Sequence, residues 1–177
     1  MGKKLIKYTV SVYTEDSVGL LNRISAIFQK RHINIESFNS SMTEIENVQR
    51  WTILVITSES LIKKIVGQIN KQIEVIQAYY HTDEETIYQE SCLFKIKSSL
   101  LFDDRKIQNI IKESNAIIVT VNPEFFVIEK SGRTHELDDL YKKLNKYGIL
   151  QYVRSARIAV TKAPLMISEI LTDFKKK

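Results

Sequence analysis

Hydrophobic and polar positions along the chain follow two periods that succeed each other. Residues 5–13 alternate with a period of two, which predicts a half-buried strand; its apolar side chains are Ile6, Tyr8, Val10 and Val12. The next apolar side chains have helical spacing, and they are Leu20, Leu21, Ile24, Ile27 and Phe28. Between the two patterns, Asp16 or Ser17 can cap the predicted helix, because their side-chain oxygens accept hydrogen bonds from its unpaired N–H groups.

The same periods continue to about residue 80. Strands are predicted over residues 34–42, 49–57 and 73–80, and a second helix follows Glu59 with its apolar face at Ile62, Ile65, Val66 and Ile69. The order is strand, helix, strand, strand, helix, strand, which is the ferredoxin-like arrangement. It places both helices on one face of a four-stranded antiparallel sheet. We expect the other face to be open and to find a partner.

The order then repeats after a polar stretch, residues 81–89, which we interpret as a linker. Strands are predicted at 92–96, 116–121, 125–129 and 149–160. One helix carries Ile107, Ile110 and Ile111, and the other carries Leu137, Leu140, Tyr141 and Leu144. The predicted fold class is therefore α+β, with two tandem ferredoxin-like domains at residues 1–80 and 90–177.

The amino-acid composition limits the kinds of protein that this chain can be. The 177 residues are 44% hydrophobic and 27% charged, so the chain can bury a core. No apolar run approaches the length of a membrane span, and we expect no membrane partner. Cys92 is the only cysteine, which excludes an internal disulfide and favours a reducing, cytoplasmic location. The net charge of +5 is spread along the chain and does not by itself argue for nucleic acid.

Catalytic chemistry has no recognisable motif in this sequence. There is no Gly-rich phosphate loop, HExxH or CxxC, and the histidines (His32, His81 and His135) are scattered. The acidic residues at 83–85 and 103–104 fit solvated charge better than a metal site. We therefore expect neither catalytic residues nor a metal in this chain. Arg154 and Arg157 are interpreted as exposed charges near the last strand.

The loop from Asp16 to Ile24 is the informative segment. Gly19 stands where the helix begins, so backbone N–H groups can approach a ligand closely, and the helix N-terminus attracts a carboxylate. Asp16 could bind the ammonium group of the same ligand. These features suit a zwitterionic amino acid. The alternative is that Asp16 and Ser17 only cap the helix and Gly19 only allows the turn.

Several motifs carry a resemblance to a known family. The segment 16–23 and the stretch 28–38, which contains Asn34-Ile35-Glu36-Ser37, resemble the opening of the ACT domain in the small, regulatory subunit of acetolactate (acetohydroxyacid) synthase. The stretches 126–132, 147–149 and 153–160 are similar to segments of the same family's second domain. Asp16 stands where the family commonly has Asn, and Val18 where it often has Pro, Ser or Ala.

The resemblance implies a regulatory function in branched-chain amino acid biosynthesis. Two ACT domains would pair side by side as a homodimer and bind a branched-chain amino acid, usually valine, at their interface. The implied effector-binding residues are Asp16, Ser17, Val18, Gly19, Leu20 and Leu21 of one protomer with Asn34 and Ile35 of the other. The partner would be the large catalytic subunit, which would carry thiamine diphosphate, Mg and FAD; this chain would hold no cofactor. The subunit would activate that enzyme and confer feedback inhibition.

Two other functions stay open at this point. The chain could be an ACT-type amino-acid sensor that regulates a different enzyme. It could also be an RRM-like nucleic-acid-binding module, since that module shares the predicted topology. An RRM needs a basic–Gly–aromatic–Gly–aromatic stretch on a central strand, whereas residues 49–57 offer Arg50 and Trp51 but no Gly. We therefore expect no nucleic-acid partner.

Overall fold

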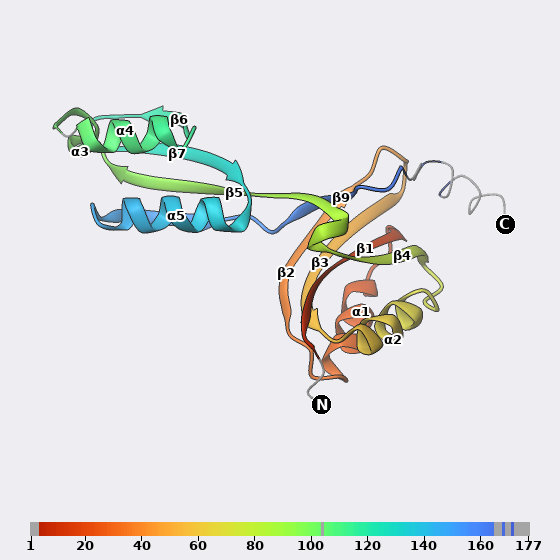
Figure 1. The fold of residues 1–177 in the computed structure, drawn as a ribbon. Coiled ribbons are helices and arrows are strands. Elements are labelled where there is room, and N and C mark those ends of the chain that lie inside the picture. Colours follow the sequence, from red (N-terminus) through yellow and green to blue (C-terminus); the bar gives the residue numbers. More distant parts are fainter. Residues whose placement is uncertain (1–3, 104, 165–167, 169–170, 172–177) are drawn as a thin grey trace. The chain divides into compact units, whose positions relative to one another are not determined.

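The predicted strand–helix order is present in the computed structural model, which describes residues 4–103 and 105–164 together with Ser168 and Leu171 (Figure 1). The chain divides into two compact units. The first unit consists of Met1–Tyr88 and Arg157–Lys177, and the second unit consists of Gln89–Ala156. The segment from Arg157 onward thus belongs with the first unit, although we expected residues 90–177 to form one domain.

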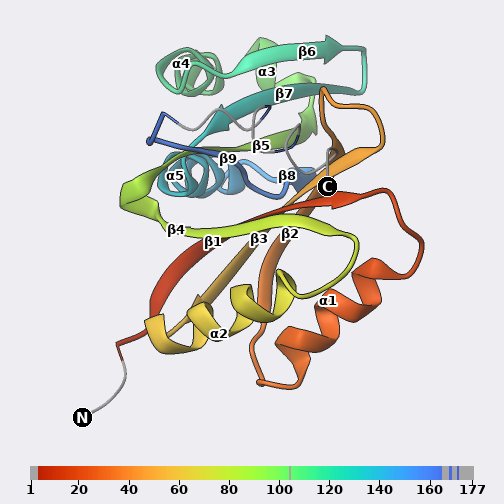
Figure 2. The same cartoon turned by 90° about the vertical axis from the view of Figure 1, so that its right-hand side faces the viewer.

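The first unit is built on a four-stranded antiparallel sheet with the order β2-β3-β1-β4. Its strands are β1 (Ile6–Glu15), β2 (Ile35–Met42), β3 (Val48–Thr57) and β4 (Val75–Thr82). The helices α1 (Leu20–Gln29) and α2 (Glu59–Ile69) cover one face of this sheet (Figures 1 and 2). The ferredoxin-like order expected for this part of the chain is confirmed.

Alternation along the central strands decides which side chains meet the helices. Val10 and Val12 of β1 and Val55 of β3 are fully buried on the helical side. Leu20 and Ile62 enter the same core from α1 and α2. The intervening side chains of β1 and β3 therefore lie on the opposite face of the sheet, as the period of two requires.

The second unit repeats the architecture with an antiparallel sheet in the order β6-β7-β5-β8. Its strands are β5 (Thr86–Lys97, which begins in the first unit), β6 (Ile117–Val121), β7 (Phe125–Gly132) and β8 (Ile149–Arg154). Its helices are α3 (Ser99–Asp103), α4 (Arg105–Glu113) and α5 (Thr134–Asn145). Both predicted ferredoxin-like orders are thus present, and the fold class is α+β.

The stretch 81–89, which we expected to be a linker, is mostly regular structure. Strand β4 runs to Thr82, a single 3-10 turn η1 occupies Asp83–Glu85, and β5 begins at Thr86. Glu85 accepts hydrogen bonds from the backbone N–H (2.8 Å) and the hydroxyl (3.0 Å) of Thr82. These bonds hold the pKa of Glu85 below its usual value, and they close the turn as a capping box.

The last strand differs from the prediction. Residues 149–160 form two strands, β8 and β9 (Ile158–Thr161), separated at residues 155–157. The backbone N–H of Ser155 donates to the carbonyl of Ser91 (2.8 Å), while its hydroxyl oxygen accepts from the N–H of Ser91 (2.8 Å). After this break the chain returns to the first unit, where Ala159 is buried.

The face of the first sheet that we expected to be open is therefore covered in part by this chain. Ala159 accepts a hydrogen bond from the guanidinium of Arg50 on β3. Leu171, which is 1% exposed, packs with Tyr13 and Val48. These contacts place β9 on the side of the sheet away from α1 and α2 (Figure 2).

Our interpretation of Arg157 as an exposed charge is wrong, because its side chain is 1% exposed. Its guanidinium donates to Asp83 (2.5 Å) and to the hydroxyl of Thr9 (3.2 Å). It also lies 3.5 Å from the ring centroid of Tyr88. The carboxylate of Asp83, the hydroxyl of Thr9 and the ring of Tyr88 together stabilise the buried guanidinium.

Removing the partner of this buried cation should destabilise the fold. We expect Asp83→Asn to lower the free energy of unfolding by about 1 to 2 kcal/mol, because it removes the carboxylate charge that the buried guanidinium of Arg157 contacts. Urea denaturation followed by circular dichroism measures the change.

The matched control is Asp139→Asn, which removes an exposed carboxylate 3.6 Å from Lys142. Exposed pairs of this kind contribute little, so no measurable loss is expected. Equal stability of the two variants would contradict the structural role assigned to Arg157.

Candidate functional site

The predicted effector loop connects β1 to α1, and Gly19 sits at its end. Gly19 is the N-cap residue of α1 and has a φ of 83°, in the left-handed region that side chains other than glycine rarely adopt. It is exposed, and a Cβ atom added there would meet no other atom within 4 Å. The space in front of the helix start is therefore open to a ligand.

The N-terminus of α1 has no side-chain cap among the described residues. The expectation that Asp16 or Ser17 caps this helix is therefore wrong. The first turn of an α-helix carries N–H groups without intrahelical partners, and these groups together with the helix dipole favour an anion. An exposed, uncapped helix start is the arrangement expected for binding a carboxylate.

Asp16 is held by a hydrogen-bond network that leads away from the helix. Its carboxylate accepts from the side-chain amide of Gln49 at 2.7 Å. The oxygen of that amide in turn accepts from the indole N–H of Trp51 (3.0 Å) and from the hydroxyl of Ser40 (3.3 Å). The network fixes the position of Asp16 while its exposed carboxylate keeps the capacity to accept from a cation.

The apolar residues of the loop divide into two groups. Leu20 is fully buried in the core, so it anchors the start of α1. Val18 is fully exposed, and the side chain of Leu21 is 47% exposed. Exposed aliphatic side chains beside an anion-binding helix start suit a ligand that carries a carboxylate and a short branched tail.

Asn34 and Ile35 lie at the other end of the sheet in the same protomer. Ile35 pairs with Val55, which pairs with Tyr8 near the start of β1, whereas the loop follows Glu15 at the end of β1. Glu15 lies seven positions after Tyr8, which corresponds to about 23 Å along a strand. One protomer therefore does not bring the two parts of the predicted site together.

A partly buried cluster of polar side chains lies in the second unit. The side chain of Arg154 donates to Glu90 (2.7 Å) and to Asp138 (2.6 Å), so the interpretation of Arg154 as a solvated charge is also wrong. Thr134 adds a hydrogen bond to Glu90 at 3.0 Å. This cluster ties α5 to β5 and β8, and its partners are protein groups.

Cys92 is packed in the core, as expected. Burial raises the pKa of its thiol, and burial together with the hydrogen-bonding contact to Cys92 raises the pKa of Tyr152 to about 12. A thiol held neutral in this way is a poor nucleophile. The buried position does not fit covalent catalysis.

In residues 4–103 and 105–164, with Ser168 and Leu171, no three His, Cys, Asp or Glu side chains are placed to hold a metal ion. Within the same residues, no helix is both long and apolar enough to span a membrane.

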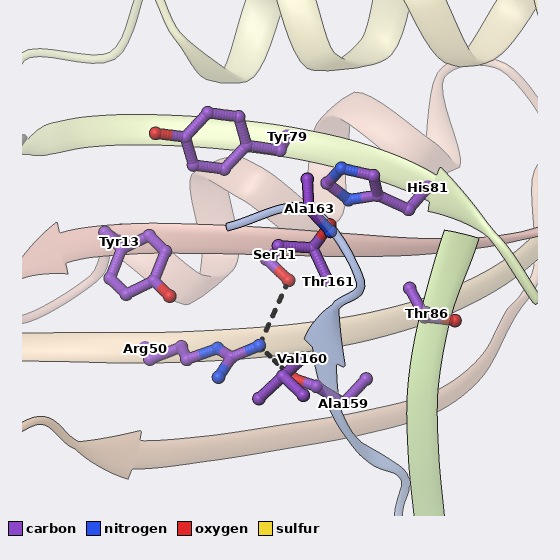
Figure 3. A pocket seen from close by; sticks show the side chains of 10 residues that line it. All are labelled: Ser11, Tyr13, Arg50, Tyr79, His81, Thr86, Ala159, Val160, Thr161 and Ala163. Atoms are coloured by element: carbon purple, nitrogen blue, oxygen red, sulfur yellow. Dashed lines mark hydrogen bonds between the residues drawn. The ribbon is translucent and has the colours of Figure 1, made fainter. Parts of the chain in front are cut away.

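The sequence reasoning missed a cavity on the face of the first sheet opposite the helices. Its volume is about 140 Å³, and its central cation is Arg50 (Figure 3). The period of two already places Ser11, Tyr13 and Arg50 on this face. The part of the wall formed by residues 159–163 could not be foreseen, because the return of the chain to the first unit was not predicted.

Known proteins resemble this chain along most of its length. Residues 10–77 match the family described as the AHAS small subunit-like ACT domain, and residues 89–163 match the family described as the small subunit of acetolactate synthase. An acetolactate synthase small subunit of Mycobacterium bovis is 31% identical over 160 residues, which are 89% of this chain and 93% of that protein. The chain belongs to the acetolactate synthase small-subunit family.

Other members of the family agree in length and fold. The acetolactate synthase small subunit of Bacillus subtilis is 30% identical over 155 residues, covering 87% of this chain and 90% of that protein. The crystal structure of the acetolactate synthase small subunit from Thermotoga maritima has a TM-score of 0.80 with 20% identity, covering 90% of this chain and 99% of that one. This small subunit therefore shares its fold with a solved family member.

The backbone of Gly19 generates a prediction with an internal control. We expect Gly19→Ala to lower the free energy of unfolding by about 1 kcal/mol, because the left-handed backbone conformation is unfavourable for alanine. Gly67→Ala should stabilise the small subunit by about 0.5 to 1 kcal/mol, because Gly67 lies inside α2 with equal space around it. Urea denaturation of both variants tests this, and shifts of the same sign would contradict the conformation of the loop.

Proposed function

We propose that this chain is the regulatory subunit of acetolactate synthase. In this proposal it binds the thiamine diphosphate-dependent catalytic subunit, raises its activity and makes it responsive to a branched-chain amino acid, with valine as the first candidate. The observation that supports the proposal most directly is the uncapped start of α1 behind Gly19, in a member of the small-subunit family. Effector binding is assigned to residues 1–80.

The proposed effector is recognised by three groups on the loop. Its carboxylate accepts hydrogen bonds from the free N–H groups at the start of α1. Its ammonium group donates to Asp16, whose orientation is set by Gln49. Its branched side chain lies against the exposed side chains of Val18 and Leu21.

A second copy of the chain is needed to complete this site. Asn34 lies at the far end of the sheet from the loop, but β2 is an edge strand of the sheet. In a two-fold pairing of β2 edges, the strands run antiparallel, so the start of one β2 lies beside the end of the other. This pairing moves Asn34 and Ile35 of one protomer toward the loop end of the other.

Asn34 suits a position across a symmetry axis. Its exposed amide both donates and accepts hydrogen bonds, so it can bind the backbone groups of an amino acid. A ligand shared between protomers favours the paired state over the unpaired one. Effector binding would then change the assembly that meets the catalytic subunit, which is the differential affinity that regulation requires.

Reconstitution with the catalytic subunit tests the regulatory function. We expect this chain to co-purify with the acetolactate synthase catalytic subunit of the same organism and to raise the rate of acetolactate formation. Valine should lower the rate of the complex more than the rate of the catalytic subunit alone. Failure to stimulate the cognate enzyme, with valine still bound, would favour a sensor for a different enzyme.

Two variants of Gly19 separate charge from bulk at the proposed effector site. Aspartate and asparagine have the same shape and both tolerate a left-handed backbone. We expect Gly19→Asp to weaken valine binding at least tenfold more than Gly19→Asn, because only the former sets a negative charge beside the effector carboxylate.

Isothermal titration calorimetry of the purified chain measures both affinities. Asn34→Ala should weaken valine binding by about tenfold through the loss of one or two hydrogen bonds. Equal affinity in the wild type and all three variants would place the effector elsewhere. Analytical ultracentrifugation of each variant, with and without valine, shows whether the dimer persists.

A further inference from the structure

A cavity of about 140 Å³ lies in the first unit, on the face of the sheet away from α1 and α2 (Figure 3). Strands β1, β3 and β4 provide one wall, and residues 159–163 together with Thr86 provide the other. All of its lining residues belong to the first unit. The effector loop begins the helix on the opposite face, so the cavity is a separate feature.

Arg50 is the charged group of this cavity. One terminal nitrogen of its guanidinium donates to the hydroxyl of Ser11 (3.4 Å) and to the backbone carbonyl of Ala159. The Nε–H group is buried, and it has no hydrogen-bond partner among the described residues. The guanidinium carbon lies 5.7 Å from the ring centroid of Tyr13. A buried donor on a permanent cation calls for an acceptor.

The other residues that line the cavity supply further hydrogen-bond donors, and none of them carries a carboxylate. His81 and Tyr79 border the cavity from β4, and Thr86 and Thr161 contribute hydroxyl groups. Burial raises the pKa of Tyr13 and of Tyr79, so both phenols stay protonated at neutral pH and can donate. None of the ten lining residues is acidic. The cavity is therefore complementary to negative charge.

The volume limits the size of the ligand. At roughly 30 Å³ for each water, the cavity holds about four or five water molecules. This space suits a carboxylate with a short carbon chain and is too small for a nucleotide. The ring of Tyr13 and the side chain of Val160 offer apolar contact to such a chain.

We propose that this cavity is a second ligand site, which binds a small carboxylate through Arg50. The carboxylate accepts a charge-assisted hydrogen bond from the guanidinium of Arg50, whose Nε–H has no partner among the described residues. The ligand would connect β3 to the returning segment at residues 159–163. Binding at this site does not require the branched-chain effector or the catalytic subunit.

Nuclear magnetic resonance of the full-length wild-type chain tests the site. Sodium pyruvate and sodium acetate are the carboxylate probes, sodium phosphate is the second oxyanion, and sodium chloride at equal ionic strength is the reference. We expect saturable amide shifts for Ser11, His81 and residues 159–161 with the carboxylates. Shifts centred on Gly19 and Leu21 instead would overturn the proposal, as would a response equal to that of chloride. Saturation with phosphate alone would overturn the carboxylate assignment.

Arg50→Gln supplies the mutational test. We expect it to weaken binding of the carboxylate probe by about tenfold or more, because a charge-assisted pair is lost. Arg105→Gln removes the same charge from an exposed position on α4 and should leave the affinity unchanged. Unchanged affinity in a folded Arg50→Gln chain would overturn the proposal; if that variant does not fold, the wild-type shift map decides.

Discussion

The pairing of β1 with β3 is the constraint on which the first unit depends. The two strands match residue for residue from Ile6 opposite Thr57 to Glu15 opposite Val48, and β1 also pairs with β4. Because successive side chains point to opposite faces, a slip of one residue would exchange Val10 and Val12 for polar neighbours in the core. This register fixes the helical face, the end of β1 where the loop begins and the composition of the opposite face.

Local patterns were sufficient to predict most of the architecture. Period-two stretches gave the strands, and the spacing of Ile62, Ile65 and Ile69 gave α2, because each of these signals is read within one element. The break at Ser155–Arg157 was missed because residues 149–160 are β-rich throughout. The break is caused by tertiary contacts. The backbone N–H of Ser91 donates to the hydroxyl of Ser155, and the carboxylate of Asp83 accepts from Arg157. Neither partner is visible in a local window.

Only the local features of the candidate site were predictable from the sequence. Gly19 before an apolar helical pattern indicates a left-handed residue at the helix start, and the structure has that conformation. The expectation of a cap from Asp16 failed because Gln49, 33 residues away, competes for the carboxylate. The cavity around Arg50 was missed because its wall comes from the far end of the chain. Long-range contacts thus account for each difference.

The return of the chain after the second unit makes that unit an insertion. Strand β5 leaves the first unit, and the chain comes back at Arg157 to bury Ala159 and Leu171 on the first sheet. A fragment that ends at Tyr80 would therefore lack part of the packing of the first unit. It would lose Leu171, which packs against Tyr13 and Val48, and it would lose the contact between Thr9 and Arg157. The boundary that the sequence suggests for an independent effector module is consequently not the boundary at which its packing is complete.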